Sequence, residues 1–244
     1  KGFAPAFYRA PLDNDRNICK YWHTIGLQNT SNICKGSSFT DNGDNIVVTT
    51  NIKSIANCIL PVANTQIKYT IYPNGNILVD VNCLGGGAVK LLPRFGVMLE
   101  MPKEYENIKY FGLGEDVNLP DYKEHTINKI YQTTVDKLKE DYIKPQESAT
   151  RCDVRFAEIT NASGFGLRFE AVSKPFVFSA SHYTSNQWAK AMHRDDLVDL
   201  PTTCVNIDSS VLGAGSNACG PLPDKKDRVG SLSGKKLSFV VKPI

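Results

Sequence analysis

Alternation of apolar and polar residues limits this chain, more than any other feature, to a fold built from β-strands. The apolar residues Ile67, Tyr69 and Ile71 occupy every second position. The segment 73–76, Pro-Asn-Gly-Asn, follows them, and the alternation resumes over residues 77–81. Because successive side chains of a strand point to opposite faces, this pattern predicts a hairpin with one buried face and a turn at the Asn-Gly pair.

Other segments repeat the alternation, and Gly, Asn and Pro separate them. They lie at residues 95–99, 165–169, 176–180, 204–208 and 237–241. Short strands divided by turn residues predict a sandwich or a barrel. The 244 residues contain neither an evident linker nor a repeat. We therefore expect one all-β domain over residues 1–244, larger than a small sandwich of about 100 residues.

Helical signals are sparse in this sequence. Asp15 is expected to cap a short helix that carries Ile18, Trp22 and Ile25 on one face, with Trp22 in the core. A second segment, residues 184–192, has the composition of one or two helical turns. Helices are therefore expected to be minor additions to a β fold.

Charge and hydropathy exclude several classes of partner. The 28 basic and 25 acidic residues leave a net charge of +3, too balanced for a nucleic-acid surface. No run of eighteen apolar residues occurs, so no membrane span is expected. The first residues lack the apolar core of a signal peptide and resemble the middle of a longer protein. The cytoplasm and the periplasm both stay open as locations.

The seven cysteines and four histidines show no metal-binding pattern. The cysteines are scattered without a C-x-x-C pair, which argues against a zinc site and against a full disulfide framework. The histidines never fall at the spacing of metal ligands. We expect buried thiols, no metal and no cofactor.

Several short motifs follow one another along nearly the whole chain, and their order carries more information than any one of them. They are Arg9-Ala10-Pro11-Leu12-Asp13-Asn14-Asp15, Pro93-Arg94-Phe95-Gly96, Gly112-Leu113-Gly114, Pro120-Asp121, Tyr142-Ile143-Lys144-Pro145-Gln146-Glu147 with Arg151, His193-Arg194, Asn206-Ile207-Asp208 and Gly213-Ala214-Gly215-Ser216-Asn217. This series resembles the C-terminal, small-chain domain of the multi-domain β-galactosidases of glycoside hydrolase family two.

The resemblance implies a large antiparallel β-supersandwich that is galactose-mutarotase-like, similar to aldose-1-epimerases. It also implies that the chain is a C-terminal fragment of a larger enzyme that hydrolyses terminal β-D-galactosides. Retaining hydrolysis needs two carboxylates about 5 Å apart. In this family both are glutamates on a TIM barrel, so we expect no catalytic residue here and an inactive isolated domain.

The role expected for such a domain is to shape the mouth of the active-site pocket and to stabilise the arrangement of the enzyme's domains. Its implied partners are the upstream barrel and sandwich domains of the same polypeptide and the galactoside, and a homo-oligomer of the full-length enzyme is compatible with this role. The loop 213–221 is expected to project toward the barrel. Where some members carry a sugar-covering Trp, this chain has Ala218-Cys219-Gly220. Ser216, Asn217 and Cys219 could then offer only hydrogen bonds and a small apolar contact.

The polar cluster at the start of the chain has two interpretations. The cluster consists of Arg9, Asp13, Asn14 and Asp15. It either forms a buried network that fixes the first residues of the domain, which we favour, or belongs to a loop near the substrate. In the first case Asp13→Ala would destabilise the domain by about 1–3 kcal/mol. Further buried ion pairs are expected at three other arginines, Arg94, Arg151 and Arg155. Glu147 is expected to be a structural residue as well.

Three further residues are candidates for sugar contact. His182 or His193, paired with Glu147, Glu158 or Glu170, would suit a stand-alone epimerase, although a core histidine is the plainer alternative. Trp188 lies in a polar segment and is expected to be an exposed ring that could stack on a sugar. A lectin-like module is therefore a third hypothesis beside the β-galactosidase domain and the epimerase.

Overall fold

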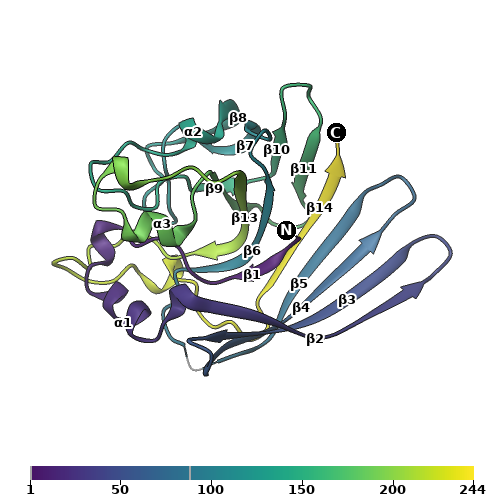
Figure 1. The fold of residues 1–244 in the computed structure, drawn as a ribbon, viewed down its shortest axis with the longest axis horizontal. Helices are drawn as coiled ribbons and strands as arrows, with labels where there is room; N and C mark the ends of the chain where they lie inside the picture. Colours follow the sequence, from purple (N-terminus) through teal and green to yellow (C-terminus); the bar gives the residue numbers. More distant parts are fainter. Residues whose placement is uncertain (1, 88) are drawn as a thin grey trace.

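The computed structural model, described here for residues 2–87 and 89–244, is built from two antiparallel sheets (Figure 1). The five-stranded sheet has the order β1 (Ala4–Ala6), β6 (Arg94–Pro102), β13 (Thr202–Val211), β12 (Phe176–Ser181), β9 (Arg151–Val154). The nine-stranded sheet has the order β2 (Thr30–Asp41), β3 (Ile46–Ala56), β4 (Leu60–Ile71), β5 (Ile77–Gly86), β14 (Lys236–Pro243), β11 (Gly166–Ala171), β10 (Phe156–Thr160), β7 (Asn107–Gly114), β8 (Ile127–Thr134). The predicted all-β, antiparallel fold is confirmed.

The predicted hairpin is present as β4 and β5. Ile71 lies opposite Ile77 and Tyr69 opposite Val79, so the turn falls where the Asn-Gly pair stands. The other predicted strands are also found, with one correction: Phe165 lies before β11 and is 67% exposed. Its amide instead donates to the side chain of Asn161 in the turn from β10.

The core lies between the two sheets and is rich in aromatic rings. The inward side chains of β6, Phe95, Val97 and Leu99, are buried, as the alternation predicts. From the opposite sheet Phe169 and Phe239 approach each other with ring centroids 6.3 Å apart and inclined rings. Such edge-to-face contacts add to the gain from burying the rings themselves.

The helices are short: α1 (Ile18–Thr24), α2 (Val135–Leu138), α3 (Ser185–Lys190), and the 3-10 turns η1 (Asp13–Asp15), η2 (Leu27–Asn29), η3 (Arg194–Asp196) and η4 (Lys225–Asp227). Trp22 of α1 is buried and its indole N–H donates to Leu91 O at 2.8 Å. The expected cap is wrong, because Asn17 precedes α1 and Asp15 lies in η1 instead. Thr184 caps α3 by accepting from the Gln187 amide.

The expectation of buried thiols holds for some of the cysteines only. Cys83 and Cys152 are buried, whereas Cys34, Cys58 and Cys219 are exposed and have free thiols. Burial raises the pKa of the Cys152 thiol to about 12, with the neighbouring Asp153 charge acting in the same direction. Within the described part of the chain, no helix combines the length and apolarity needed to cross a bilayer.

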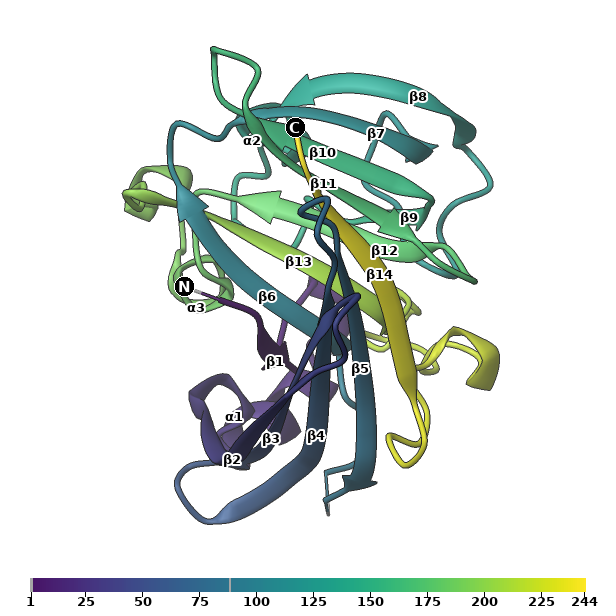
Figure 2. The same ribbon diagram turned by 90° about the vertical axis from the view of Figure 1, so that its right-hand side faces the viewer.

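The nine-stranded sheet reaches well beyond the five-stranded one. In Figure 1 the hairpins of β2 with β3 and of β4 with β5 extend to the right, away from the body that β6, β13 and the helices form; in Figure 2, which faces that side, they lie in front of the body. Residues 31–41 of β2, the edge strand, are all exposed. One part of this sheet therefore lacks the cover that the second sheet gives to the rest.

Candidate functional site

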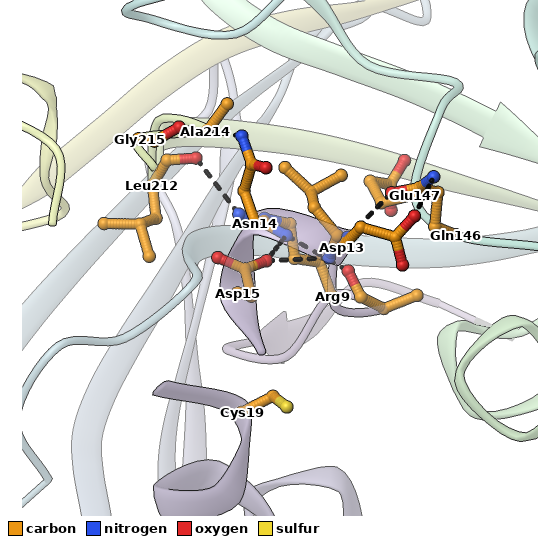
Figure 3. A network of polar contacts seen from close by, with 12 residues as sticks. Arg9, Asp13, Asn14, Asp15, Cys19, Gln146, Glu147, Leu212, Ala214 and Gly215 are labelled. Atoms are coloured by element: carbon orange, nitrogen blue, oxygen red, sulfur yellow. Dashed lines mark hydrogen bonds and ion pairs between the residues drawn. The ribbon is translucent and has the colours of Figure 1, made fainter. Parts of the chain in front are cut away.

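A buried ion pair organises the polar cluster at the start of the chain (Figure 3). Arg9 Nη1 lies 2.6 Å from Asp15 Oδ2, and both side chains are nearly inaccessible to solvent. The same carboxylate oxygen accepts from the Leu12 amide at 2.8 Å, which closes the η1 turn around it. The Arg9 guanidinium also lies 5.8 Å from the centre of the Trp22 ring. These contacts connect the segment after β1 with η1 and α1.

The two remaining members of the cluster lie nearer the surface. Asp13 is exposed, and its amide donates to Gln146 Oε1 at 2.9 Å. Asn14 is half-buried and donates through Nδ2 to Gly215 O at 2.7 Å. The expectation that Asp13 is a buried partner is therefore wrong, because Asp15 takes that place beside Arg9.

The loop 213–221 lies against this cluster and is held through its backbone. Asp121, in the segment between β7 and β8, accepts from the amides of Ala214 and Gly215 at 2.6 and 2.8 Å. Asn17 donates to Asn217 O at 2.7 Å, and Arg9 donates to Leu212 O at 3.3 Å. The loop is therefore fixed at its base from two sides.

Asp121 also explains a glycine in the loop. A Cβ at Gly213 would lie 2.5 Å from the Asp121 carboxyl carbon, so a larger residue would displace the acid from the loop amides. Sequence reasoning did not assign a role to Asp121. The available signal was its place in the ordered motifs, and its partner lies 93 residues away in sequence.

The three loop residues considered for sugar contact make mostly local hydrogen bonds. Ser216 is exposed and its hydroxyl donates to Pro221 O at 3.3 Å. Asn217 is half-buried, with Nδ2 3.5 Å from Gly220 O. Cys219 is exposed, and its amide donates to Ser216 O. The loop thus presents small polar groups in a defined conformation.

Trp188 is not the exposed ring that its polar neighbours predicted. Its side chain is only 4% exposed, and it packs beside Tyr183 with ring centroids 6.5 Å apart. It lines a pocket with Tyr142 and Gln146, and its indole N–H has no hydrogen-bond partner among the described residues. Stacking of a sugar on an open Trp188 face is therefore not what this geometry offers.

The two candidate histidines lie in different surroundings. His182 is buried, and its Nδ1 is 3.3 Å from the Thr203 hydroxyl. His193 has 73% of its side chain exposed and lies 4.0 Å from Asp196. The carboxylates proposed as partners contact basic side chains instead: Glu147 with Arg94, Glu158 with Arg168, and Glu170 with Lys242. These three glutamates are thus paired with basic side chains, and neither histidine has one of them as its partner.

A second buried charge network lies between β6 and β13. Arg94 Nε is 3.3 Å from Asp208 Oδ2, and Arg94 Nη2 is 3.9 Å from Glu147 Oε2. Burial raises the pKa of Asp208 to about 7, while the Arg94 charge opposes the rise. Asp208 stood in a recognised motif, but sequence alone did not identify it as the partner of Arg94.

The other two arginines do not form the expected buried ion pairs. Arg151 is buried and donates to the carbonyls of Thr150 and Leu138, both at 3.0 Å. Arg155 is exposed and stacks 4.9 Å from the centre of the Phe111 ring. A guanidinium donates to carbonyl oxygens and is attracted to a ring face, although neither contact supplies the opposite charge of a carboxylate.

The described residues, 2–87 and 89–244, contain no group of three His, Cys, Asp or Glu side chains placed to hold a metal ion. A metal ligand set usually needs at least three protein groups. The arrangement that the structure does show is a loop held by hydrogen bonds beside the Arg9–Asp15 pair.

Known proteins with similar sequences are β-galactosidases. The enzyme of Actinobacillus pleuropneumoniae is 29% identical over 215 residues, which covers 88% of this chain and 21% of that protein. The enzyme of Streptococcus thermophilus is 26% identical over 249 residues, covering 100% of this chain and 24% of that protein. This chain thus spans about a fifth to a quarter of the length of these relatives.

Among solved structures, a putative aldose 1-epimerase from Escherichia coli is similar with a TM-score of 0.40 and 9% identity, covering 85% of this chain and 67% of that one. The family model described as beta galactosidase small chain matches residues 1–241. The match runs over almost all of the sequence, as the ordered motifs do. The chain therefore belongs to the β-galactosidase small-chain family.

Proposed function

We propose that this chain is the C-terminal domain of a retaining β-galactosidase that acts on terminal β-D-galactosides, and that it edges the active-site pocket and holds the architecture. The observation that carries the proposal is the family match over residues 1–241 together with a span of only 21% of a β-galactosidase relative. The catalytic glutamates would then lie in the remaining part of the enzyme. No cofactor is expected in this domain.

The geometry supports a role in positioning. Two ion pairs are deeply buried, Arg9 with Asp15 and Arg94 with Asp208. Within each pair the two charges contact each other, so they are not free to act on a substrate. The Asp121 carboxylate accepts hydrogen bonds from backbone amides of the loop 213–221, and Ser216 and Cys219 of this loop are exposed. A fixed, polar loop of this kind suits the rim of a carbohydrate pocket.

A direct test compares the chain with the enzyme to which it would belong. The purified 244-residue chain should not hydrolyse a chromogenic β-galactoside above buffer background. The protein encoded by the complete reading frame should hydrolyse it, and deletion of this domain should abolish that activity. Hydrolysis by the pure chain that is lost on replacing one of its own acidic residues would contradict the proposal.

Asn217 provides a test of the rim assignment. In the complete enzyme, Asn217→Ala should raise KM by less than about tenfold, equivalent to under about 1.4 kcal/mol, and leave kcat unchanged. The reason is that a rim amide offers one hydrogen bond to the bound sugar, while charge develops at the distant glutamates. Asn74→Ala, in the exposed β4–β5 turn, serves as the control. A kcat loss of about a hundredfold in a folded variant would show that the loop acts in the transition state.

Two alternatives have separate tests. A mutarotation assay on the chain addresses the epimerase hypothesis, for which His182 contacts Thr203 rather than one of the candidate glutamates. Calorimetry with galactose addresses the lectin-like hypothesis. We expect neither mutarotation nor tight galactose binding by the chain on its own.

A further inference from the structure

The outer end of the nine-stranded sheet, which we call the wing, consists of β2, β3 and residues 67–72. It projects from the body in Figure 1. β2 is its edge, and residues 31–41 of that strand are exposed. The two faces of the wing differ in chemistry, and this difference can be followed through the strand register.

The inner face of the wing continues the core face of the sheet. Phe39 lies opposite Val48, which lies opposite Tyr69, and the row runs on to the buried residues Val79 and Phe239. Directly paired residues share a face. The row is therefore apolar from end to end, yet its outer member Phe39 is 77% exposed.

A second row is apolar from β3 inward, and its member in the edge strand β2 is Asp41, which lies opposite Ile46. Ile46 lies opposite Ile71, and Ile71 lies opposite Ile77. Ile46 is 42% exposed and Ile71 is 36% exposed, although buried Val241 continues the row in β14. Apolar side chains that extend a core stripe into solvent mark a contact surface rather than ordinary surface scatter.

The outer face of the same strands is more polar than the inner face, although Ile33 and Val47 also lie on it. Thr49 lies opposite Lys68 and Lys68 opposite Asp80, with a salt-bridge distance of 3.3 Å between the last two. Ser238 continues this row and donates to Asp80 at 2.7 Å. An antiparallel sheet with one polar and one apolar face normally packs its apolar face against another layer. The wing has the pattern of a covered sheet, although part of its apolar face has no cover.

The first residues of the chain already cover the inner end of this face. Phe3 lies with its ring centroid 6.5 Å from that of Tyr69 and 5.4 Å from that of Phe239. Asn32, on the inner side of β2, donates to Pro5 O at 2.9 Å. The cover thus begins with the segment before β1 and stops short of Phe39 and Ile46.

We propose that the inner face of the wing is the docking surface for an apolar surface in the remaining part of the β-galactosidase. This inference rests on the proposed function, in which about four-fifths of the enzyme lies outside this chain. The occupant continues the cover that Phe3 begins. Edge-to-edge pairing of two copies is disfavoured, because β2 carries a bulge between Cys34 and Gly36, with Lys35 at that point.

Three exposed thiols make the proposal measurable without an activity assay. Cys34 pairs with Ile52 on the inner face of the wing, Cys58 lies in the turn between β3 and β4, and Cys219 lies in the loop 213–221. All three should react readily with a maleimide in the chain alone. In the complete enzyme, labelling of Cys34 followed by peptide mass spectrometry should be slowed at least about tenfold relative to Cys58.

A pair of variants on one strand provides the matched control. Phe39 and Ile33 are both exposed residues of β2, but their partners Val48 and Lys53 place them on opposite faces. Phe39→Ser should leave the unfolding midpoint of the chain alone unchanged and should accelerate Cys34 labelling in the complete enzyme. Ile33→Ser should change neither quantity.

The outcomes separate this inference from the proposed function. An active enzyme in which Cys34 reacts as fast as in the chain alone overturns the docking surface and leaves the function standing. Concentration-dependent protection of Cys34 in the chain alone identifies a second copy as the occupant and also overturns it. Protection of Cys34 in a complete protein that hydrolyses no β-galactoside supports a covered wing and refutes the function.

Discussion

Replacing Arg94 with methionine is expected to lower the free energy of unfolding by about 3–5 kcal/mol, the usual cost of breaking a buried ion pair. The Arg94 side chain is 1% exposed and faces Asp208 and Glu147, which are 0% and 6% exposed. Methionine retains much of the side-chain length but carries no charge. Two carboxylates would then remain buried without their cation.

The loss of stability caused by Arg94→Met should depend on pH, and the protonation of Asp208 determines whether it grows or shrinks as pH rises. Burial raises the pKa of this carboxyl from 3.8 to about 7, with Arg94 lowering it and Glu147 raising it. Between about pH 4 and 7 the folded state therefore binds more protons than the unfolded state, so this group's stabilising contribution is lost as pH rises. Without Arg94 the pKa rises further. The deficit of Arg94→Met should be smaller near pH 5 than near pH 8.

Urea unfolding of the chain, followed by far-UV circular dichroism at both pH values, measures this effect. Arg155→Met is the control, because that guanidinium is exposed over the Phe111 ring and should contribute under about 1 kcal/mol. Adding Asp208→Asn to Arg94→Met should recover part of the loss, since one stranded charge disappears. A loss that is the same at both pH values would contradict the assignment of buried, ionisable partners.

Strands and turns could be predicted from this sequence because both signals are local. The alternation around residues 67–81 places side chains on alternate faces, and the Asn-Gly pair accommodates the turn, so the β4–β5 register follows directly. The same alternation could not reveal that the inner face of the wing lacks cover. Phe39 and Val79 lie in one row across the sheet, but the tertiary arrangement buries Val79 and leaves Phe39 in solvent.

The sequence-based predictions are wrong where a residue's environment depends on a partner that is distant in sequence or that competes with a local one. The neighbours of Asp15 predict a helix cap, but the Arg9 guanidinium offers its carboxylate a stronger, charge-assisted hydrogen bond. Trp188 was expected at the surface because Ser185, Asn186 and Gln187 are polar. The helix α3 spans six residues, too few for its periodicity to show which face is buried.

The candidate site was only partly accessible from sequence for the same reason. The motifs identified Arg9, Asn14 and the loop 213–221 as separate features. The fold brings them together through contacts between residues about 200 positions apart, such as Asn14 with Gly215. Asp121 joins the same site from a third segment. Pairings over such separations depend on the packing of the two sheets, which no local pattern specifies.

Replacing Asp15 with alanine is the second change expected to have a large effect, a loss of about 3–5 kcal/mol in the free energy of unfolding. The substitution removes the carboxylate 2.6 Å from Arg9 and leaves that guanidinium buried with only carbonyl partners. The Leu12 amide loses its acceptor as well. Because the Arg9 side chain also contacts Trp22 and Leu212 O, the entry segment, α1 and the base of the loop should loosen together.

Asp13→Ala is the matched control, two residues away on the same turn. Asp13 is exposed, and its carboxylate accepts one long hydrogen bond of 3.4 Å from Gln146. Its removal should cost under about 1 kcal/mol, because water replaces an exposed partner at little expense. Urea unfolding of both variants decides the matter. If Asp13→Ala keeps full stability but lowers the activity of the complete enzyme, the exposed edge of the cluster contacts substrate; if both variants lose equally, the Arg9–Asp15 pair is not what holds this entry.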